Sequence, residues 1–388
     1  MRILFLTPFL PDQGAHHGGG SYIGALAAGL RDRAELGLAY LGRPGDGAPD
    51  AATWSWSASV PYEGDPSGLG HRLKMLARWR GLPLLAAKHG SAAMRALLAR
   101  ARQEFYPDVA LVEMAQMAHF LPELRGIPTV LTDHEAGQPA NAGTGLGAWA
   151  DRRDAALWSR YLRSYFPLAD RLQAVTEEDA ASLRGALGRS VEVRPAALLA
   201  PHGACDPGAA PPTALFVGDY RHRPNPEAAR RLADEVWPKI RDRCPEAQLL
   251  LAGPHPEPVQ DLSRVEGVQV LGFVEDLTGL MGSARLMLGP TWSGGGFRVK
   301  NATALLHGLP VVTNALGARG CAAGAPACTI AETPDALAAA TCALLQDPAR
   351  ARAAGDAARQ WALAQFSPSA VATRQLETLR SLAPGASA

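Results

Sequence analysis

The chain has 388 residues, of which 47% are hydrophobic and 19% are charged, and its formal net charge at pH 7 is +1. These values predict a soluble globular protein with two domains of ordinary size, and they exclude a largely disordered chain. They also give no whole-molecule attraction for nucleic acid, and no apolar run approaches the about 20 residues of a membrane span.

The five cysteines are odd in number and widely spaced, and no two of them form a CxxC pair: Cys205, Cys244, Cys321, Cys328 and Cys342. This usage favours reduced structural thiols over disulfides or a zinc site, and it predicts a cytoplasmic protein. The opening MRILFLTPFLP is short and broken by prolines, and no small-residue cleavage site follows it. We interpret it as a first strand and not as a signal peptide.

The first half of the chain alternates short apolar runs with helical periods, which predicts a parallel sheet with helical crossovers. Strands are expected at residues 3–7, 36–41, 109–113, 129–132 and 172–175. Helices are expected over the apolar face that begins at Tyr22, over 150–166, and after Thr176, which can cap a helix with an acidic first turn.

A glycine-rich loop, His16 to Ser21, separates the first strand from the first helix, where a doubly wound sheet usually presents a ligand loop. Its glycines, Gly18, Gly19 and Gly20, do not have GxGxxG spacing, and no acidic residue promptly follows the second strand. Both observations argue against a nicotinamide dinucleotide. The two histidines lack metal-ligand spacing, so a solvated loop is the alternative.

A segment without periodicity, PHGACDPGAAPP at residues 201–212, is interpreted as a linker. The alternation of short apolar runs and helical periods then begins again, with strands expected at 214–217, 248–252, 268–273, 285–288 and 310–313. A helix is expected from Asn225, which can cap it, followed by Pro226 and Glu227. Alanine-rich helices are expected from Pro334 onward. Two similar α/β halves predict a ligand cleft at the carboxyl ends of both sheets.

The segment 290–314, PTWSGGGFRVKNATALLHGLPVVTN, is the most informative part of the chain. Its three glycines at 294–296 follow an apolar run, and Arg298 and Lys300 stand where a helix is expected to begin at Val299. Glycines permit close approach of a ligand, a helix start offers N–H groups and a positive dipole end, and the two cations add charge. The segment therefore predicts a diphosphate site. A tight turn with two solvated cations is the alternative.

Other polar residues are expected at strand ends. His134, in the run Thr132-Asp133-His134-Glu135, can donate to a sugar hydroxyl or a phosphate, whereas its neighbours face the other way on an extended segment. A polar strand end without a role is the alternative. Arg221 lies near a helix start and suits an anion, although it can also be merely solvated. Phe273 and Val274 end a strand and can border a nucleobase.

These pieces resemble the family 4 retaining glycosyltransferases, which are nucleotide-sugar enzymes with the two-domain GT-B fold. The likeness rests on an FVG strand end at 216–218, HRPNPEA at 222–228, LLLAGP at 249–254, VQVLGFVEDL at 268–277 and GGGFRVKNATALLHGLPVVTN. It implies two Rossmann-like doubly wound parallel-sheet domains facing a central cleft. The implied bounds are 1–200 for an acceptor domain, 201–212 for a linker, 213–365 for a donor domain and 366–388 for a helix that returns to the first domain.

The resemblance also implies roles for residues. His134, Arg298 and Lys300 are the expected catalytic residues, with the two cations on the donor diphosphate and His134 beside the transferred sugar. The expected donor-binding residues are Gly18, Gly19, Gly20, Gly218, Arg221, Phe273, Val274, Gly295, Gly296, Phe297 and Thr303. No DxD pair lies in a suitable loop, so neither a metal nor another cofactor is expected.

The chain departs from the family at two positions. Members often carry two glutamates eight positions apart, which touch the sugar and the ribose, and Gly295 and Thr303 stand at the matching positions here. A hydroxyl at Thr303 can still bond a ribose, but a neutral contact has about half the strength of a charge-assisted one. Donor preference, ribose recognition and activity all depend on this change.

A basic amphipathic segment occupies residues 66–103, which contain eight Lys and Arg and no acid, interleaved with leucines, methionines and a tryptophan. Such a segment suits the anionic inner face of a membrane, and ordinary helices with a solvated basic face are the alternative.

The sequence thus predicts a cytoplasmic, metal-independent, retaining glycosyltransferase that uses a nucleotide-diphosphate sugar as donor. Its acceptor is a glycan, a lipid-linked molecule or a protein. Two rivals remain: a non-catalytic GT-B nucleotide-sugar-binding partner, which the missing glutamates suit, and a sugar epimerase that needs no acceptor.

Overall fold

The computed structural model of the protein describes residues 1–11, 18–64, 68–134, 147–199, 201, 203–321, 326 and 328–382. The chain forms two compact units, which are treated separately below. The first unit contains Met1–Leu199 and the chain from Pro368 onward, and the second unit contains Ala200–Ser367. Within the described residues, no helix is long and apolar enough to cross a membrane.

The first unit is built on a seven-stranded sheet in the order β3-β2-β1-β4-β5-β6-β7. Its strands are β1 (Arg2–Thr7), β2 (Glu35–Gly42), β3 (Trp56–Pro61), β4 (Val109–Glu113), β5 (Thr129–Asp133), β6 (Arg171–Ala174) and β7 (Glu192–Val193). Each neighbouring pair is parallel, so all carboxyl ends lie at one edge of the sheet. The order is that of a doubly wound sheet, with the switch point between β1 and β4.

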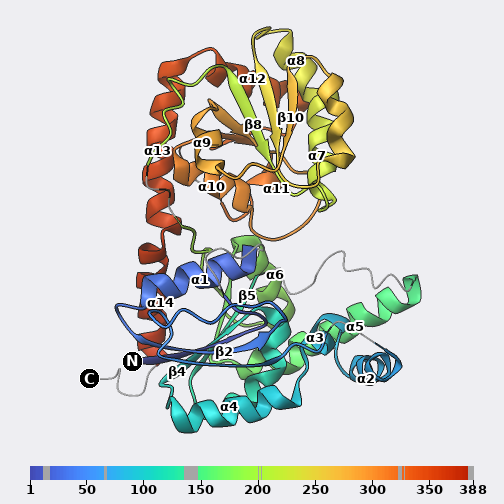
Figure 1. Ribbon diagram of the computed structural model, residues 1–388, viewed down its shortest axis with the longest axis vertical. Coiled ribbons are helices and arrows are strands. Elements are labelled where there is room, and N and C mark those ends of the chain that lie inside the picture. The colour runs from blue at the N-terminus through green and yellow to red at the C-terminus, as the bar shows by residue number, and fades with distance from the viewer. Residues whose placement is uncertain are drawn as a thin grey trace. The chain divides into compact units, whose positions relative to one another are not determined.

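The helices of the first unit cover both faces of this sheet (Figure 1). They are α1 (Gly18–Leu30), α2 (Leu69–Trp79), α3 (Leu84–His89), α4 (Ala92–Glu104), α5 (Ala148–Tyr165), α6 (Glu177–Leu187) and α14 (Pro368–Leu382), with 3-10 helices η1 (Ala115–Leu124) and η2 (Phe166–Leu168). Side chains along β1 point alternately to the two faces of the sheet, which explains why helices cover both faces. Ile3 and Phe5 pack with residues of α1 and α14, whereas Leu4 and Leu6 pack with residues of α4, η1 and α5.

Helices α1 and α14 pack closely although they are far apart in sequence. Gly29 of α1 permits this approach, because a Cβ atom at this position would lie 2.3 Å from the carbonyl oxygen of Pro368. On α14, Val371, Leu376 and Leu379 are buried in the cluster that also contains Ile3. The helix expected from residue 366 begins at Pro368, since α13 ends at Phe366 and Ser367 is extended.

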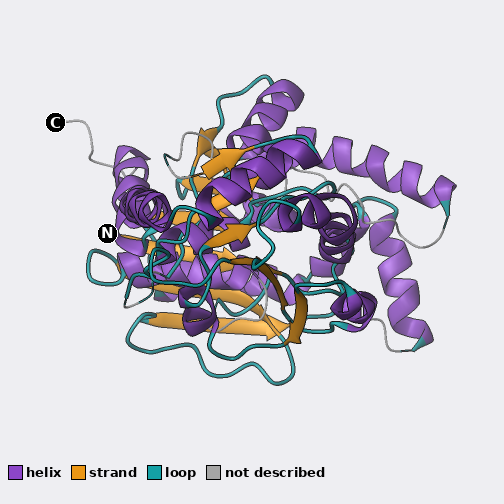
Figure 2. Cartoon of the chain, turned by 90° about the horizontal axis from the view of Figure 1, so that it is seen from above, coloured by secondary structure: helices purple, strands orange, loops and turns teal. Residues whose placement is uncertain are grey.

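The second unit repeats the pattern with a six-stranded sheet in the order β10-β9-β8-β11-β12-β13, in which all neighbouring pairs are parallel. Figure 2 distinguishes the helices and strands of the chain by colour. Its strands are β8 (Thr213–Val217), β9 (Gln248–Ala252), β10 (Val268–Gly272), β11 (Leu286–Leu288), β12 (Val311–Thr313) and β13 (Cys328–Ile330). Its helices are α7 (Pro224–Arg231), α8 (Trp237–Arg241), α9 (Leu277–Gly282), α10 (Val299–His307), α11 (Ala315–Ala318), α12 (Pro334–Leu345) and α13 (Pro348–Phe366), with a π-helical turn at Leu232–Val236 and a 3-10 helix at Glu257–Arg264.

The strands and long helices expected from periodicity are confirmed to within two residues at their ends, except that α1 begins at Gly18, inside the loop expected to extend to Ser21. Thr176 caps α6 as expected, because its side chain accepts a hydrogen bond from the Asp179 N–H. Gly308 ends α10 in the left-handed region at φ 79°. Three strands were not expected: β3, which alternates exposed and half-buried residues at a sheet edge, and the very short β7 and β13.

Candidate functional site

The glycine-rich loop of the second unit connects β11 to α10. Gly294 and Gly296 have φ angles of 86° and 76°, which are left-handed conformations that favour glycine. The Ser293 hydroxyl donates to Glu227 Oε2 at 2.7 Å and so ties the loop to α7. Gly295 is exposed between them. The loop therefore presents backbone, rather than side chains, just before the start of α10.

The buried side chain of Arg298 forms hydrogen bonds with the backbone of this loop. Its guanidinium donates to the carbonyl oxygens of Gly294 at 2.7 Å, Gly295 at 3.2 Å and Leu316 at 3.0 Å. The residue is only 8% exposed. Arg298 was expected to hold the donor diphosphate directly, whereas the contacts seen here shape the turn that precedes α10.

Lys300 stands in the first turn of α10 and has a different environment. Its ammonium nitrogen donates to Asn225 Oδ1 at 3.0 Å and lies 4.0 Å from the centroid of the Phe216 ring. Removal of the ammonium from water, together with the positive charge of Arg298, lowers the pKa of Lys300 to about 7. No carboxylate in the described part of the chain pairs with Lys300, and such a lysine at a helix start is well suited to an anionic ligand.

Asn225 positions this lysine. Its amide Nδ2 donates to the carbonyl oxygen of Asp219 at 2.9 Å, which orients Oδ1 toward Lys300. Gly218 leaves the room for it, because a Cβ atom on Gly218 would lie 2.6 Å from Asn225 Cγ. The expectation that Asn225 caps α7 is wrong. The helix begins at Pro224, and no side-chain bond caps it, because the Asn225 amide is engaged elsewhere.

Two buried asparagines fix the ends of β11 and β12 and were not expected as site residues. Asn301 Nδ2 donates to the carbonyl oxygens of Gly289 at 2.9 Å and Gly317 at 2.8 Å. Asn314 Oδ1 accepts from the N–H groups of Thr291 and Gly317, and its Nδ2 donates to the Thr291 carbonyl. For Asn301 the signal in the sequence was an amide on the apolar face of a helix, and for Asn314 it was an amide at the N-cap position of α11.

The remaining donor-binding candidates differ in exposure. Phe273 is 73% exposed after β10, and Val274 beside it is half-buried. Phe297 is buried and packs edge-on against Phe366 at 5.6 Å between ring centroids. Thr303 is half-buried on α10. Arg221 is exposed and donates to Asp219 Oδ2 at 2.9 Å, and this bond lowers the Asp219 pKa. Its charge is already paired.

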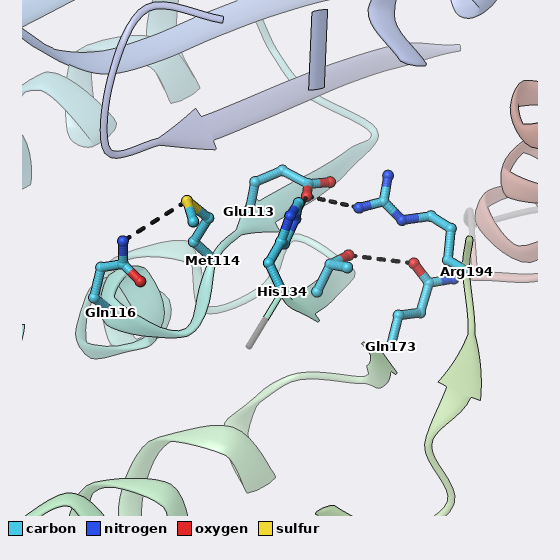
Figure 3. A network of polar contacts seen from close by, with 7 residues as sticks. Glu113, Met114, Gln116, His134, Gln173 and Arg194 are labelled. Atoms are coloured by element: carbon cyan, nitrogen blue, oxygen red, sulfur yellow. Dashed lines mark hydrogen bonds and ion pairs between the residues drawn. The ribbon is translucent and has the colours of Figure 1, made fainter. Parts of the chain in front are cut away.

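In the first unit, three charged or polar side chains converge at the carboxyl ends of the strands (Figure 3). Glu113 ends β4, His134 follows β5, and Arg194 follows β7. His134 Nε2 lies 2.8 Å from Glu113 Oε2, and Arg194 Nη2 lies 2.7 Å from the same oxygen. Glu113 is fully buried, and the other two side chains are nearly so.

Burial of the Glu113 carboxyl raises its pKa, but the charge of Arg194 and the hydrogen bond with His134 outweigh this effect and lower the pKa below its ordinary value. Glu113 is therefore a buried carboxylate. Of these residues the sequence singled out only His134. The signal for Glu113 was an acid at the end of an otherwise apolar strand, and no local pattern marked Arg194.

The glycines that were expected in the loop after β1 lie in a helix instead. Gly18, Gly19 and Gly20 form the first turn of α1, one turn before Tyr22. The Tyr22 ring lies nearly parallel to the His134 ring, at 6.3 Å between centroids. His16, His17 and Glu135 lie outside the described residues. Asp133 is described and is buried at the end of β5.

Comparison with known proteins gives a family model for the second unit. Residues 211–347 match the model described as glycosyl transferases group 1. No curated protein matches the chain.

Solved structures match nearly the whole chain. Sucrose-phosphate synthase from Thermosynechococcus elongatus is 18% identical with a TM-score of 0.70, covering 98% of this chain and 99% of that one. HepE from Anabaena, in complex with UDP and glucose, is 17% identical with a TM-score of 0.62, covering 98% and 99%. WaaG, a glycosyltransferase involved in lipopolysaccharide biosynthesis, is 15% identical with a TM-score of 0.60, covering 99% and 100%. At these identities the likeness shows the fold alone, which is GT-B with two Rossmann-like parallel-sheet domains.

Proposed function

We propose that the protein is a glycosyltransferase that moves a sugar from a nucleotide-diphosphate sugar to an acceptor. The observation that carries this proposal is the Lys300 ammonium, which has no carboxylate partner within the residues that the structure describes. It lies at the start of α10, next to the glycine-rich loop of a unit that matches a glycosyltransferase model. The complex of the structurally similar HepE with UDP and glucose supports a nucleotide sugar as the ligand.

The mechanism follows from charge. When the glycosidic bond breaks, negative charge grows on the departing diphosphate, so a fixed cation lowers the barrier more than it tightens ground-state binding. Lys300 and the start of α10 supply that charge, and Arg298 keeps the loop in the shape that admits the phosphates. Retention of the anomeric configuration and independence from a metal belong to the proposal, and they are tested by the anomer of the product and by turnover in chelator.

Lys300→Ala tests the proposal directly. It should lower kcat by about 100-fold or more while weakening nucleotide affinity much less, because the lost interaction is strongest in the transition state. Equal losses in kcat and affinity would contradict this mechanism. Lys239→Ala is the matched control, since Lys239 belongs to the same unit but is exposed and paired with Asp335.

The donor is found by thermal-shift screening against UDP, GDP, dTDP and their sugars, because a ligand that binds only the native state raises the melting temperature. The same panel tests the second candidate function, a non-catalytic nucleotide-sugar-binding protein. Gly295 and Thr303, in place of two family glutamates, favour that candidate. It predicts a thermal shift with a nucleotide sugar but neither transfer nor donor hydrolysis.

We further propose that an anionic membrane surface is a partner of the first unit. On α2, Leu73 and Leu76 are 58% and 51% exposed, and the adjacent Arg72 and Arg80 have no ion-pair partner among the described residues. Trp149, at the start of α5, is 65% exposed. Arg153 links the two helices, because its guanidinium lies over the rings of both Trp79 and Trp149.

Apolar side chains beside unpaired cations are what an anionic bilayer surface binds. In a flotation assay, the protein should move with phosphatidylglycerol-containing liposomes at low salt and should dissociate from them at high salt. Leu73→Ser with Leu76→Ser should reduce binding about tenfold, whereas Leu168→Ser, an exposed leucine elsewhere in the unit, should not. Binding that is insensitive to salt and to the double substitution would remove the idea.

A further inference from the structure

We propose that Glu113 and Arg194 are positioning residues that hold His134 as a neutral imidazole with its proton on Nε2. The second ring nitrogen, Nδ1, is then a hydrogen-bond acceptor, and the ligand group that fits it is a hydroxyl of the bound sugar. This inference rests on the proposed function for the identity of the ligand, but the state of His134 can be measured without any ligand.

The first step is the geometry at Glu113. One oxygen, Oε2, receives both His134 Nε2 at 2.8 Å and Arg194 Nη2 at 2.7 Å. An ionised carboxylate can only accept hydrogen bonds, so the imidazole nitrogen that faces it must carry a proton. This contact therefore assigns the proton of a neutral His134 to Nε2.

The second step is the charge of the cluster. Glu113 and Arg194 form a buried ion pair, so the charge of the Glu113 carboxylate is balanced by Arg194 without a second proton on His134. A carboxylate and a histidine alone would favour an imidazolium. Arg194 removes that preference, which leaves His134 neutral and leaves Nδ1 with a lone pair.

The third step is the unsatisfied atom. His134 Nδ1 is buried and has no hydrogen-bond partner among the described residues. A buried acceptor without a donor costs free energy, and it is usually explained by a missing ligand or water. The Tyr22 ring, nearly parallel to the imidazole, restricts rotation of the ring on one side. The cluster lies at the carboxyl ends of β4, β5 and β7, where sheets of this kind bind their ligands.

The fit to a hydroxyl follows from donor chemistry. A sugar hydroxyl can donate to Nδ1, whereas a phosphate oxygen at neutral pH cannot donate and would meet another lone pair. No proton is transferred and no bond is made in this role. Glu113 and Arg194 act through His134, so their substitution should change sugar positioning without changing nucleotide binding by the second unit.

The experiment uses the full chain labelled with 15N-histidine and no ligand. The His134 signals are identified by their loss in His134→Gln, and long-range proton–nitrogen correlations show which ring nitrogen is protonated. The expected wild-type pattern is a protonated Nε2 and an unprotonated Nδ1. In Glu113→Leu the preference for Nε2 should be lost, because no acceptor then faces this ring nitrogen. In Arg194→Met a second proton should appear on His134, whereas Arg194→Lys should keep the wild-type pattern.

A proton on Nδ1 in the wild type, or an unchanged pattern in Glu113→Leu, would overturn the inference. The wild-type spectrum alone decides if Glu113→Leu does not fold. Enzyme kinetics give a second test. Glu113→Gln and Arg194→Met should each lower kcat with a nucleotide sugar about tenfold, whereas the dissociation constant of the free nucleotide should change less than twofold. Failure of nucleotide binding in the wild type would instead contradict the proposed function and would leave the tautomer result intact.

Discussion

Lys300 shows how surroundings set the charge of a single residue. Its ammonium lies over the Phe216 ring, pairs with no carboxylate among the described residues, and has a pKa lowered to about 7. Both protonation states of this lysine are therefore populated near neutral pH. An anionic ligand favours the protonated form, so binding and protonation of this lysine must be linked.

We expect the affinity for a nucleotide sugar to fall about tenfold between pH 6 and pH 8.5, as Lys300 loses its proton on passing pH 7. A nucleotide sugar is the right probe, because its diphosphate diester does not titrate in this range. Calorimetric titration at three pH values measures the effect. Lys300→Met should bind more weakly and show a flat profile; a slope that persists in this variant would assign the pH dependence to another group.

The same lysine affects stability with a definite sign. Between pH 7 and its ordinary value of about 10.4, the unfolded chain holds a proton on this residue that the folded chain lacks. The contribution of Lys300 to the free energy of unfolding therefore rises with pH across this window, and it is lost again as the pH falls back to about 7. Urea denaturation at pH 6 and pH 8.5 should show a larger gain for wild type than for Lys300→Met.

At the scale of elements, Asn301 joins three segments around the glycine-rich loop at residues 294–296. Its amide connects α10 to the residue after β11 and to α11 through two carbonyl oxygens. A Cβ atom on Gly289 would lie 1.9 Å from Asn301 Oδ1, so a glycine is needed opposite it. The loop thus precedes a helix whose buried face is held in place by the hydrogen bonds of Asn301.

We expect Asn301→Ala to lower the free energy of unfolding by about 2 kcal/mol, because the carbonyl oxygen of Gly317 loses its side-chain donor and that of Gly289 keeps only the Thr313 hydroxyl. Chemical denaturation measures this loss. Thr303→Ala is the control, since Thr303 lies on the same helix but is half-buried, and a change within about 0.5 kcal/mol is expected there. Equal losses in the two variants would show that the helix, and not the amide, is the sensitive part.

Elements were easier to predict than contacts. Period-2 and period-3.6 patterns located the long strands and helices, and Thr176 and Gly308 marked helix ends because capping is a local property. Edge strands such as β3 have one half-exposed face and give a weaker signal. Interactions between distant residues could not be predicted: Arg194 meets Glu113 from 81 positions away, and Lys300 meets Asn225 from 75.

The candidate site shows the same limit. The positions of Arg298 and Lys300 at a helix start were predictable from glycine spacing, since a turn and a helix N-terminus are local features. Their different contacts were not, because carbonyl oxygens from 294, 295 and 316 decide what Arg298 binds. A local pattern identifies the kind of residue at a site, and tertiary packing decides which of its donors remain for a ligand.

At the scale of the whole molecule, α14 completes the first unit although it is separated from Leu199 by the entire second unit. Its apolar face is buried against α1 and β1. Stability of the first unit should therefore depend on residues beyond Ser367, whereas the second unit is continuous in sequence.

We expect Leu379→Ala to lower the free energy of unfolding of the first unit by about 3 kcal/mol, because Leu379 is fully buried in its core. Hydrogen exchange read by mass spectrometry should show faster exchange in α1 and β1 and unchanged exchange in residues 203–321. The half-buried Leu382, changed to Ala, is the matched control. Faster exchange throughout both units would contradict the independence of the two cores.

The same chain order has a consequence for biosynthesis. A ribosome releases the strands of the first sheet early, then the whole of the second unit, and only afterwards the helix with Val371, Leu376 and Leu379. Because domains fold as units while synthesis proceeds, the later-made unit can finish before the earlier-made one. During that interval the apolar surface awaiting α14 is uncovered, so the nascent N-terminal part is the portion of this protein that chaperones must protect.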